Sequence, residues 1–498
     1  MKLPTISPQR ANFKWWVFAT VAVGTFVSVM DQTGVNLALP RIADNFDATI
    51  PAVQWVALGY ILTTGSLLMP MGKLSDMLGR KRIYVAGFLV FTIGAVLTGL
   101  APTLLSVILF KVLQGVGAAM VQANGMAIVT STFAPSERGK AIGLFLTVVG
   151  VGAIAGPVVG GAVVGAFGWR FIFFMGLPFG LASIVAALVV LEGRSAEDSL
   201  QGGDKASFDW IGAFLSSAAL ATFLLVMTNA HRVGWGSPIV AAAMAGVVVL
   251  FVGFLWWERR APDPMLALEL FRHRLFSLGN SASFLVFLAG TSVFFLMPFY
   301  LQGVLGYSPG RAGLTMAPTA VAFAVLGPIS GRLSDRYGWR RFAVAGLAAS
   351  LISMLMLSRL GTTASVGQVV TALALQGVGM GMFFSPNASA VLSTVERERY
   401  GIATAFMNMV RNIANVTGVG LATAVVTATM GSMGFEPTLD AVSSGGDAGA
   451  REAFTEGLSL AYIVTAGFVA LALVLTIFGG HQREAARAEA DRSLPSKV

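Results

Sequence analysis

The sequence predicts an all-α polytopic membrane protein with fourteen transmembrane helices, and three observations support this fold class. Hydrophobic residues make up 55% of the 498 residues and charged residues only 11%, whereas soluble domains carry roughly 25% charged residues. The apolar residues fall in continuous runs of about 20, the length that crosses roughly 30 Å of hydrocarbon as a helix. These runs lack the alternating pattern of barrel strands, so helices are the expected spanning elements.

The expected spans follow one another along the chain, separated by short polar segments. They are 15–39, 51–71, 83–101, 103–131, 140–166, 168–191, 209–229, 238–257, 277–302, 311–330, 342–360, 365–393, 401–428 and 457–479. The first run continues into Pro40 without a small-residue cleavage site, so we interpret it as a retained helix rather than a signal peptide. The segment from Gly431 to Glu456 is rich in Gly, Ser and acidic residues and is expected to form a flexible external loop.

The distribution of basic residues predicts how the helices are oriented. An even number of spans places both termini on one side, and the tails and loops of that side hold 25 of the 33 Lys and Arg residues, against six on the other side. By the positive-inside rule, both termini are expected to be cytoplasmic and the chain to be a multi-pass protein of the inner (cytoplasmic) membrane. The net charge of +9 therefore follows from topology, and nucleic acid is not an expected partner.

An internal repeat divides the chain into two similar halves. GKLSDMLGRKR (Gly72–Arg82) returns as GRLSDRYGWRR (Gly331–Arg341), and LQGVGAAM (Leu113–Met120) returns as LQGVGMGM (Leu375–Met382), at offsets of 259 and 262 residues. Two parallel repeats of six helices suit alternating access around a central cavity. The expected organisation is an N-terminal six-helix bundle (1–191), an inserted helix pair (192–260), a C-terminal six-helix bundle (261–480) and a cytoplasmic tail (481–498).

Three charged residues fall well inside apolar spans: Asp31, Lys111 and Arg411. Charges at such depth are rare and usually functional. Asp31 lies eight residues before the outer end of its span and Lys111 eight residues after the outer start of its own, which puts both roughly 12 Å below the outer surface, in position to pair across the cavity. Because the proton affinity of a carboxylate depends on burial and nearby cations, we expect Asp31 to be the proton-coupling residue. The alternative is a structural acid that orders the first helix.

Further motifs complete the pattern: MDQTGVNLALP (30–40), ILFKVLQGVGAAM (108–120), GVGAIAGPVVGG (150–161) and WRFIFFMGLPFG (169–180). In order and spacing these resemble the major facilitator superfamily, specifically its fourteen-helix drug:proton antiporters of the EmrB/QacA type. The resemblance covers nearly the whole chain and implies a proton-coupled antiporter that exports hydrophobic or amphipathic compounds by alternating access, and not an enzyme. Two alternatives are an exporter of an endogenous lipid, fatty acid or metabolite on the same fold and, from another class, a non-transporting receptor or scaffold.

The two deep basic residues raise separate questions. Lys111 stands where this family usually has arginine, and because buried lysine can lose its proton whereas arginine stays charged, a direct role of Lys111 in proton exchange is a second hypothesis. Arg411 resembles an arginine common in this branch. It is expected to bond polar neighbours on its own helix, Asn408, Asn412 or Asn415, and both a structural role and a substrate-binding role are open.

The repeated basic loops and a glycine-rich span are expected to control the conformational change. The loops predict a latch between the halves, formed by Gly72, Asp76, Gly79, Arg80, Asp335 and Arg336, and the alternative is a topology signal alone. Small residues at four-residue spacing let helices approach closely, and proline at depth bends a helix. By resemblance, the span with these features is the antiporter helix, through Gly152, Gly156, Pro157 and Gly160.

The expected substrate cavity is lined mainly by uncharged polar groups: Gln32, Asn36, Gln54, Gln114, Asn124 and Asn387, with the cation Arg411. The chain has no cysteine and only three, widely separated histidines, so no metal site is expected. The sequence lacks a phosphate-binding GxxxxGK[ST] loop, and no cofactor is expected. The expected partners are a small hydrophobic substrate, protons and the lipid bilayer; any accessory efflux subunit is left open.

Overall fold

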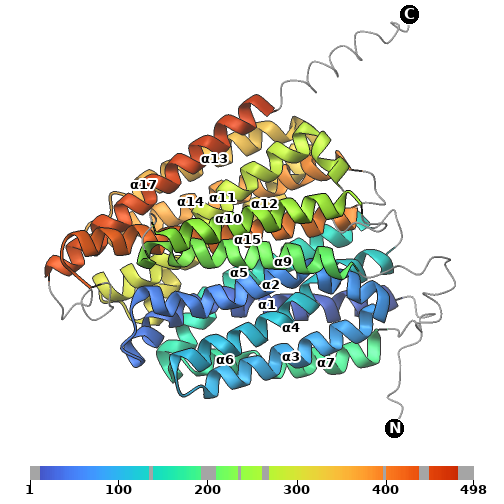
Figure 1. Cartoon of the computed structure of the whole chain (residues 1–498), viewed down its shortest axis with the longest axis horizontal. Helices are drawn as coiled ribbons and strands as arrows, with labels where there is room; N and C mark the ends of the chain where they lie inside the picture. The colour runs from blue at the N-terminus through green and yellow to red at the C-terminus, as the bar shows by residue number, and fades with distance from the viewer. Residues whose placement is uncertain are drawn as a thin grey trace, which may run out of the picture.

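The computed structural model describes residues 12–133, 138–191, 209–233, 237–260, 268–395, 400–436 and 448–479, which fold mainly into long helices lying side by side (Figure 1). The first six spans are formed by α1 (Phe13–Asn45), α2 (Ile50–Leu78), α3 (Arg80–Leu100), α4 (Leu104–Thr132), α5 (Arg138–Phe167) and the pair α6 (Phe171–Met175) and α7 (Leu177–Val190). Next come α9 (Trp210–Val233) and α10 (Pro238–Glu258). The last six follow the short 3-10 helix η1 (Leu268–Arg272) and comprise α11 (Arg274–Phe299) with the π-helical turn η2 (Tyr300–Val304), α12 (Pro309–Tyr337), α13 (Trp339–Leu357), α14 (Val366–Leu392), α15 (Tyr400–Ser432) and α17 (Ala448–Gly479).

The number of spans agrees with the prediction. In the described part of the chain, thirteen helices are long and apolar enough to cross a membrane, and a shorter apolar helix at Trp210–Phe223 supplies the fourteenth. Helices α6 and α7 form a single span, Phe171–Val190, because the backbone of Gly176 between them stays helical, with φ −73° and ψ −17°. The predicted all-α polytopic fold is confirmed.

The predicted external loop from residue 431 to residue 456 is partly wrong. Helix α15 continues to Ser432, and α17 begins at Ala448 instead of residue 457. The early turns of α17 are held by tertiary packing, since the side chain of Phe454 is 0% exposed, and a composition-based reading of a Gly- and Ser-rich segment does not reveal such packing. Residues 437–447 and the predicted tail at 481–498 lie outside the described residues.

Both halves fold the repeated basic segment in the same way. One glycine with positive φ joins the second helix of each half to the third: Gly79, with φ 96°, between α2 and α3, and Gly338, with φ 88°, between α12 and α13. A residue with a side chain is strained in this conformation. This requirement explains why glycine recurs at both turns.

The basic residue two positions after each of these glycines caps the last helix of its half. Lys81 Nζ donates to the carbonyl oxygen of Leu188 near the end of α7, at 2.8 Å, and Arg340 donates to the carbonyl oxygen of Ile477 near the end of α17. Cations are favourable at helix C-termini because the last carbonyl groups carry partial negative charge. The repeat in sequence is therefore also a repeat of contacts.

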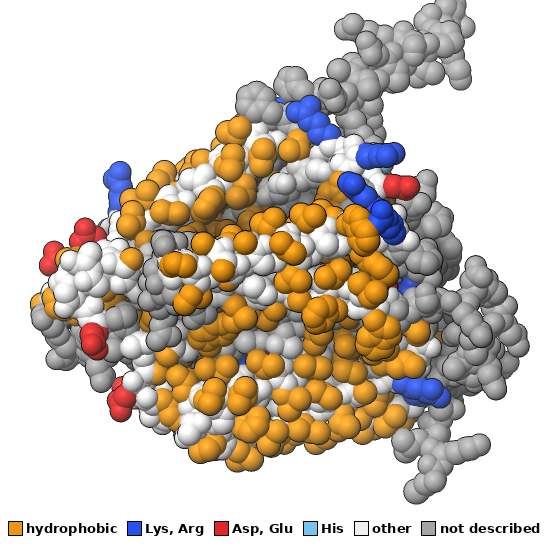
Figure 2. All heavy atoms as spheres, viewed as in Figure 1, with side chains coloured by type: hydrophobic (Ala, Val, Ile, Leu, Met, Phe, Trp, Pro, Cys, Tyr) orange, Lys and Arg blue, Asp and Glu red, His pale blue; other side chains and the backbone are white. Residues whose placement is uncertain are grey.

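The outside of the bundle is apolar over its middle and charged at its two ends (Figure 2). In this view Lys and Arg gather mainly toward the end where α1 begins and α17 ends, here called the terminal end (right in Figure 1), and most acidic side chains lie at the opposite end. Exposed apolar side chains are frequent; Val249 on α10, for example, is 69% exposed. Such a surface is stable when hydrocarbon surrounds it and all backbone groups are bonded within helices.

Helices α9 and α10 lie on the outside of the bundle, where the two halves meet (Figure 1). Helix α9 packs against α10, against α2 of the first half and against α15 of the second. Ser217 Oγ on α9 donates to the carbonyl oxygen of Ser66 on α2 at 2.8 Å, and Trp257 Nε1 on α10 donates to Asp209 Oδ1 at the start of α9 at 2.7 Å. The pair is thus attached to the bundle mainly through α9.

Candidate functional site

Asp31, Lys111 and Gln114 form one hydrogen-bonded cluster between α1 and α4. Lys111 Nζ lies 3.0 Å from Asp31 Oδ2 and donates to Gln114 Oε1 at 2.7 Å. Gln114 Nε2 donates to the same Asp31 oxygen at 3.1 Å, so each member bonds the other two. The three-residue spacing of Lys111 and Gln114 places both on the face of α4 that is turned toward α1. The predicted pairing of Asp31 with Lys111 is confirmed.

Aromatic rings enclose the ammonium group of Lys111. Its Nζ lies 4.8 Å from the ring centroid of Tyr60 on α2 and 5.2 Å from that of Phe173 on α6, within the range of favourable cation–π contacts. Tyr60 Oη in turn lies 3.3 Å from Ser28 Oγ on α1. The cluster is therefore a buried, charge-balanced site, in which any change of protonation alters an ion pair shielded from water.

The predicted location of this pair, facing across a central cavity, is wrong. Both residues lie inside the first half, where Asp31 is 6% and Lys111 0% exposed. Helices α2 and α6 cover the pair with their rings, an arrangement that depth along a span does not predict. Both hydrogen bonds go to Oδ2 of Asp31, and no residue in the described part of the chain bonds Oδ1.

Helix α5 packs tightly on α1 through its glycines. A Cβ atom at Gly152 would lie 3.0 Å from the carbonyl oxygen of Phe26, and one at Gly156 would lie 2.8 Å from that of Met30. Gly160 is equally close to α1, since its Cβ would lie 3.0 Å from the Cα of Gly34. These contacts agree with the close approach expected of the glycine-rich span.

A neighbouring edge of α5 touches the other half of the molecule. The carbonyl group of Pro157 lies directly against Gly313 on α12, and a Cβ atom at Gly161 would lie 2.6 Å from the carbonyl oxygen of Pro309. Helix α5 continues through Pro157 as one helix. The same span therefore joins α1 in its own half and α12 in the facing half.

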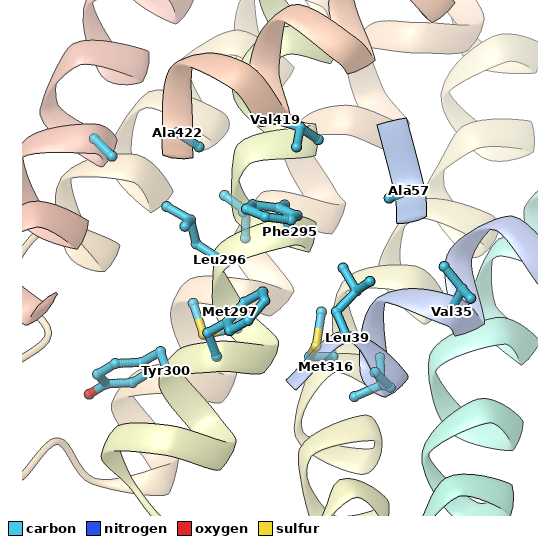
Figure 3. Close-up of a cluster of buried hydrophobic side chains, with 14 of the residues drawn as sticks. Val35, Leu39, Ala57, Phe295, Leu296, Met297, Tyr300, Met316, Val419 and Ala422 are labelled. Atoms are coloured by element: carbon cyan, nitrogen blue, oxygen red, sulfur yellow. The ribbon is translucent and has the colours of Figure 1, made fainter. Parts of the chain in front are cut away.

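The halves are also joined at the end of the bundle opposite the terminal end. Gln302 Nε2 in η2 donates to the carbonyl oxygen of Leu37 on α1 at 3.1 Å. Leu37 belongs to a cluster of buried apolar side chains from both halves, part of which is drawn in Figure 3, including Val35, Leu39, Ala57, Phe295, Met297, Met316 and Val419. A water-filled path between the halves is therefore closed at this end.

A shallow cavity of about 400 Å³ opens at this closed end. It is lined by Arg41, Asp44, Asn45, Val164, Gly165, Gly168, Trp169 and Pro309, and none of the predicted cavity residues belongs to this set. The charged pair in this lining is Arg41 with Asp44, at 4.0 Å, and their side chains are 51% and 48% exposed. Ion pairs as exposed as this contribute little to the stability of a protein. We regard it as an outer depression and not as the substrate site.

Four of the predicted cavity residues do not line a cavity in this conformation. Gln54, Gln114, Asn124 and Asn387 are at most 2% exposed and bond groups of their own half. Asn124 Nδ2, for example, donates to the carbonyl oxygen of Met120 at 2.6 Å, and Asn387 Nδ2 donates to that of Gly279 at 3.0 Å. The bond of Asn124 stays within α4, whereas that of Asn387 joins α14 to α11, as side-chain amides at membrane depth often do. Gln32, Asn36 and Arg411 are half-buried.

Arg411 on α15 does not make the predicted hydrogen bonds. Asn415 Oδ1 instead accepts from Thr291 Oγ1 on α11 at 2.6 Å, and Asn412 packs against Gly65 on α2, where an added Cβ would lie 3.0 Å from the Asn412 Cβ. Among the described residues, none forms a hydrogen bond or an ion pair with Arg411. Tertiary contacts of the asparagines have replaced the local bonds expected from spacing.

The predicted latch residues are placed as follows. Gly72 is half-buried on α2 near Ala123, Gly79 forms the positive-φ turn, and Arg336 is exposed, with its guanidinium 5.5 Å from the ring centroid of Tyr337. Arg80 Nη1 donates to the carbonyl oxygen of Ala127 on α4 at 2.9 Å, within the same half. The side chains of Asp76 and Asp335 lie outside the described residues, so the latch stays a prediction.

The second half holds an uncharged counterpart of the ionic cluster that the sequence analysis missed. Gly115 packs against the carbonyl oxygen of Tyr60, and Gly377 packs in the same way against that of Thr319. By this correspondence, Gln376 occupies the place of Gln114. The signal was present in the repeated LQGVG motif, which contains both glutamines.

The counterpart lacks the charges that would bond its glutamine. At the offset of 262 residues, the equivalent of Lys111 is Leu373. Gln376 is 1% exposed, and among the described residues neither atom of its side-chain amide has a hydrogen-bond partner; the same holds for the Thr319 hydroxyl. In the described part of the chain, a charged cluster of this kind is therefore present in the first half and not in the second.

This difference predicts opposite effects for two matched substitutions. Gln114→Leu is expected to lower the free energy of unfolding by about 2–3 kcal/mol, because Asp31 and Lys111 each lose a hydrogen bond to a charged group. Gln376→Leu is expected to leave it unchanged or raise it, because two unpaired buried polar atoms are removed. Unfolding in mixed detergent micelles, followed by tryptophan fluorescence, measures both. Equal losses in the two variants would mean that Gln376 has polar partners of its own.

Comparisons with known proteins point to one family. The family model of the Major Facilitator Superfamily matches residues 21–419 and, a second time, residues 280–496. The chain is 31% identical over 405 residues to the riboflavin transporter RibZ of Clostridioides difficile, covering 81% of this chain and 86% of that protein. It is 31% identical over 419 residues to the multidrug resistance protein Stp of Mycobacterium tuberculosis (84% and 76%) and 30% identical over 423 residues to the puromycin resistance protein pur8 of Streptomyces alboniger (83% and 82%).

A solved structure shares the fold at low sequence identity. It is the inward-facing, unoccupied form of a bacterial homolog of the human lysosomal transporter Spinster, with a TM-score of 0.64 and 18% identity over 94% of this chain and 97% of that one. This likeness supports the arrangement of the helices alone.

Proposed function

The chain belongs to the major facilitator superfamily, a family of transporters and not of enzymes, and on that premise we propose that it is a proton-coupled antiporter that exports hydrophobic or amphipathic compounds. The observation that carries the proposal is the buried cluster of Asp31, Lys111 and Gln114, the one ion pair at membrane depth among the described residues. A transporter driven by protons needs a group that binds a proton in one conformation and releases it in another, and Asp31 meets this need.

In the proposed mechanism, protonation of Asp31 changes the stability of the closed cluster. A proton on the carboxylate removes the partner of Lys111, whose ammonium group is 0% exposed, and a buried cation without its anion is strongly unfavourable. The conformation that encloses the cluster is then disfavoured relative to one that admits water to it. A proton can shift a two-state equilibrium in this way because its affinity for the two states differs.

The conformational change itself would open the closed end and close the other. In this structure Gln302, the apolar cluster of Figure 3 and the contacts of α5 with α12 hold the halves together at the end opposite the terminal end. We propose that the glycines of α5 let this contact slide without loss of packing, and that the basic loops after α2 and α12 serve as the latch at the terminal end.

The proposed orientation places the terminal end in the cytoplasm of a bacterial cell. The excess of basic residues on the side of both termini supports it, and several relatives are bacterial resistance proteins. With that orientation, the structure is closed toward the outside.

A second candidate is export of an endogenous metabolite by the same machinery. The similarity to a riboflavin transporter favours it, and the ionic cluster serves either cargo equally. The relatives named for drug resistance favour the first candidate.

Transport into proteoliposomes under an imposed pH gradient tests the proposal. We expect the gradient to drive movement of a fluorescent amphipathic drug, and its collapse by a protonophore to stop that movement. Riboflavin and a lipid supplied in parallel separate the two candidate cargos. Absence of gradient-driven movement for every compound would refute antiport.

A further inference from the structure

Arg411 lies on the face of α15 that is turned toward α11. Asn415, one turn later, bonds Thr291 on α11, and Gly418, two turns later, packs against the carbonyl group of Leu288 on α11. Residues at positions i, i+4 and i+7 share one face of a helix. The guanidinium group is thus directed to the seam between α11 and α15, and the side chain is only half-buried there.

Contacts on either side fix the depth of Arg411 in the bundle. Toward the terminal end, Phe406 of α15 stacks on Phe276 of α11 with ring centroids 5.7 Å apart. The next residue, Asn412, touches Gly65 in the middle of α2, in the facing half. Arg411 therefore lies at a level where the two halves are in contact, inside the apolar span Phe406–Ser432.

Among the described side chains of the neighbouring helices, no acidic group lies at this level. Helices α9, α11 and α15 contain no Asp or Glu. On α2 the only acid, Asp76, follows Gly65 by eleven residues, roughly 16 Å along the helix. On α17 the acids Glu452 and Glu456 lie within its first nine residues, at the opposite end of the bundle. Asp31, the deep acid of the first half, is already bonded to Lys111.

We infer that Arg411 binds an anionic oxygen of the transported compound, and that this exporter therefore prefers acidic amphiphiles to basic ones. An unpaired cation at membrane depth is unfavourable, and because no described residue of the chain supplies a counter-ion, a ligand can supply it. The planar guanidinium suits carboxylate, sulfonate or phosphate oxygens, which it can bind through two parallel hydrogen bonds. The inference deepens the proposed function and rests on it.

Half-buried aromatic rings on adjacent helices match such a ligand. Phe384 on α14 lies 5.5 Å from Phe287 on α11 and 6.1 Å from Phe323 on α12, measured between ring centroids. Phe287 directly precedes Leu288, which packs against Gly418. Gly418 follows Arg411 by seven residues on α15, so the rings lie roughly 10 Å further along the packed helices than the cation. The aromatic body of a ligand would contact these rings while its acidic group bonds Arg411.

Equilibrium binding of three probes that share one fluorophore tests this inference. They are dansyl sulfonate (anionic), dansylamide (neutral) and N-(2-aminoethyl)dansylamide (cationic), titrated against the full chain in phosphatidylcholine nanodiscs without a pH gradient. We expect the wild type to bind the sulfonate about tenfold or more tightly than the cation, as a hydrogen bond to a charged group implies. Arg411→Gln should lose that preference, and Arg411→Lys should retain part of it.

Two controls make the result specific. Dansylamide should bind Arg411→Gln within about twofold of the wild type, as a neutral ligand lacks the charge-assisted bond, which also shows that the variant is folded. Arg311→Gln removes an exposed arginine whose guanidinium stacks on Tyr307 at 3.9 Å; it changes the net charge equally and should behave as wild type.

Two other results would contradict the role inferred for Arg411, and a third would contradict proton antiport without contradicting that role. If added phosphatidylglycerol abolishes the sulfonate preference of the wild type, the anionic oxygen comes from a lipid phosphate and not from the substrate. Equal affinity of the wild type for all three probes would contradict the inference outright. Because the binding assay uses no gradient, a retained sulfonate preference with no gradient-driven transport would refute antiport alone.

Discussion

Asp31→Asn is expected to abolish export driven by a pH gradient while retaining exchange of substrate across the membrane, at a rate lowered by the loss of the charge partner of Lys111. Asparagine has nearly the same shape as aspartate but cannot bind or release a proton at neutral pH, so the conformational change loses its link to the gradient. The variant can still accept a hydrogen bond from Lys111 at the distance now occupied by Oδ2, 3.0 Å. Uphill uptake into inverted vesicles and downhill counterflow in proteoliposomes measure the two activities separately.

A matched acid on the same helix provides the control for this variant. Asp44 also lies on α1, but its side chain is 48% exposed and pairs with Arg41 only at 4.0 Å. Asp44→Asn is expected to transport like the wild type, because exposed ion pairs contribute little to the stability of a protein. Uphill transport by Asp31→Asn at the wild-type rate would exclude Asp31 as the coupling residue and would direct attention to Lys111.

The fold followed from the sequence because the relevant signals are local or repeated. Apolar run length predicts a spanning helix directly, and the shared register of two motifs separates two halves of six helices. The repeated segment placed Gly79 and Gly338 at equivalent positions, and the structure shows the reason, since both adopt a positive φ that favours glycine. The start of α17 was missed, since its first turns depend on tertiary packing around Phe454 and not on local composition.

The charged cluster was predicted only in part, for a comparable reason. Equal depth on two helices predicts that Asp31 and Lys111 can meet, and they do. Depth does not say which neighbouring helices cover the pair, so the rings of Tyr60 and Phe173 and the burial inside one half were not foreseen.

Uncharged amides are harder to place than charges. An amide can bond within one half, as Asn124 does, or face a cavity, and the residue type alone does not distinguish these cases. Gln376 shows the value of comparing halves: its role becomes apparent only when the contacts of Gly377 are set against those of Gly115.

Lys111→Met is expected to lower the free energy of unfolding by about 3–5 kcal/mol, the usual effect of removing one partner of a buried ion pair. The substitution keeps the length of the side chain and its contacts with Tyr60 and Phe173, but it leaves the carboxylate of Asp31, which is 6% exposed, without its cation. The double variant Asp31→Asn/Lys111→Met removes both charges and is expected to recover most of that loss, because an apolar replacement of a whole buried pair is often neutral.

A double-mutant cycle in mixed detergent micelles measures this coupling, with tryptophan fluorescence reporting unfolding. Interaction energies above about 2 kcal/mol are expected, because Lys111 donates directly to Oδ2 of Asp31 and the side chain of Gln114 bonds both residues. Additive losses would mean that Asp31 and Lys111 stabilise the protein independently. A proton on Asp31 would then leave Lys111 unaffected, and the ion pair would have no means of driving the conformational change.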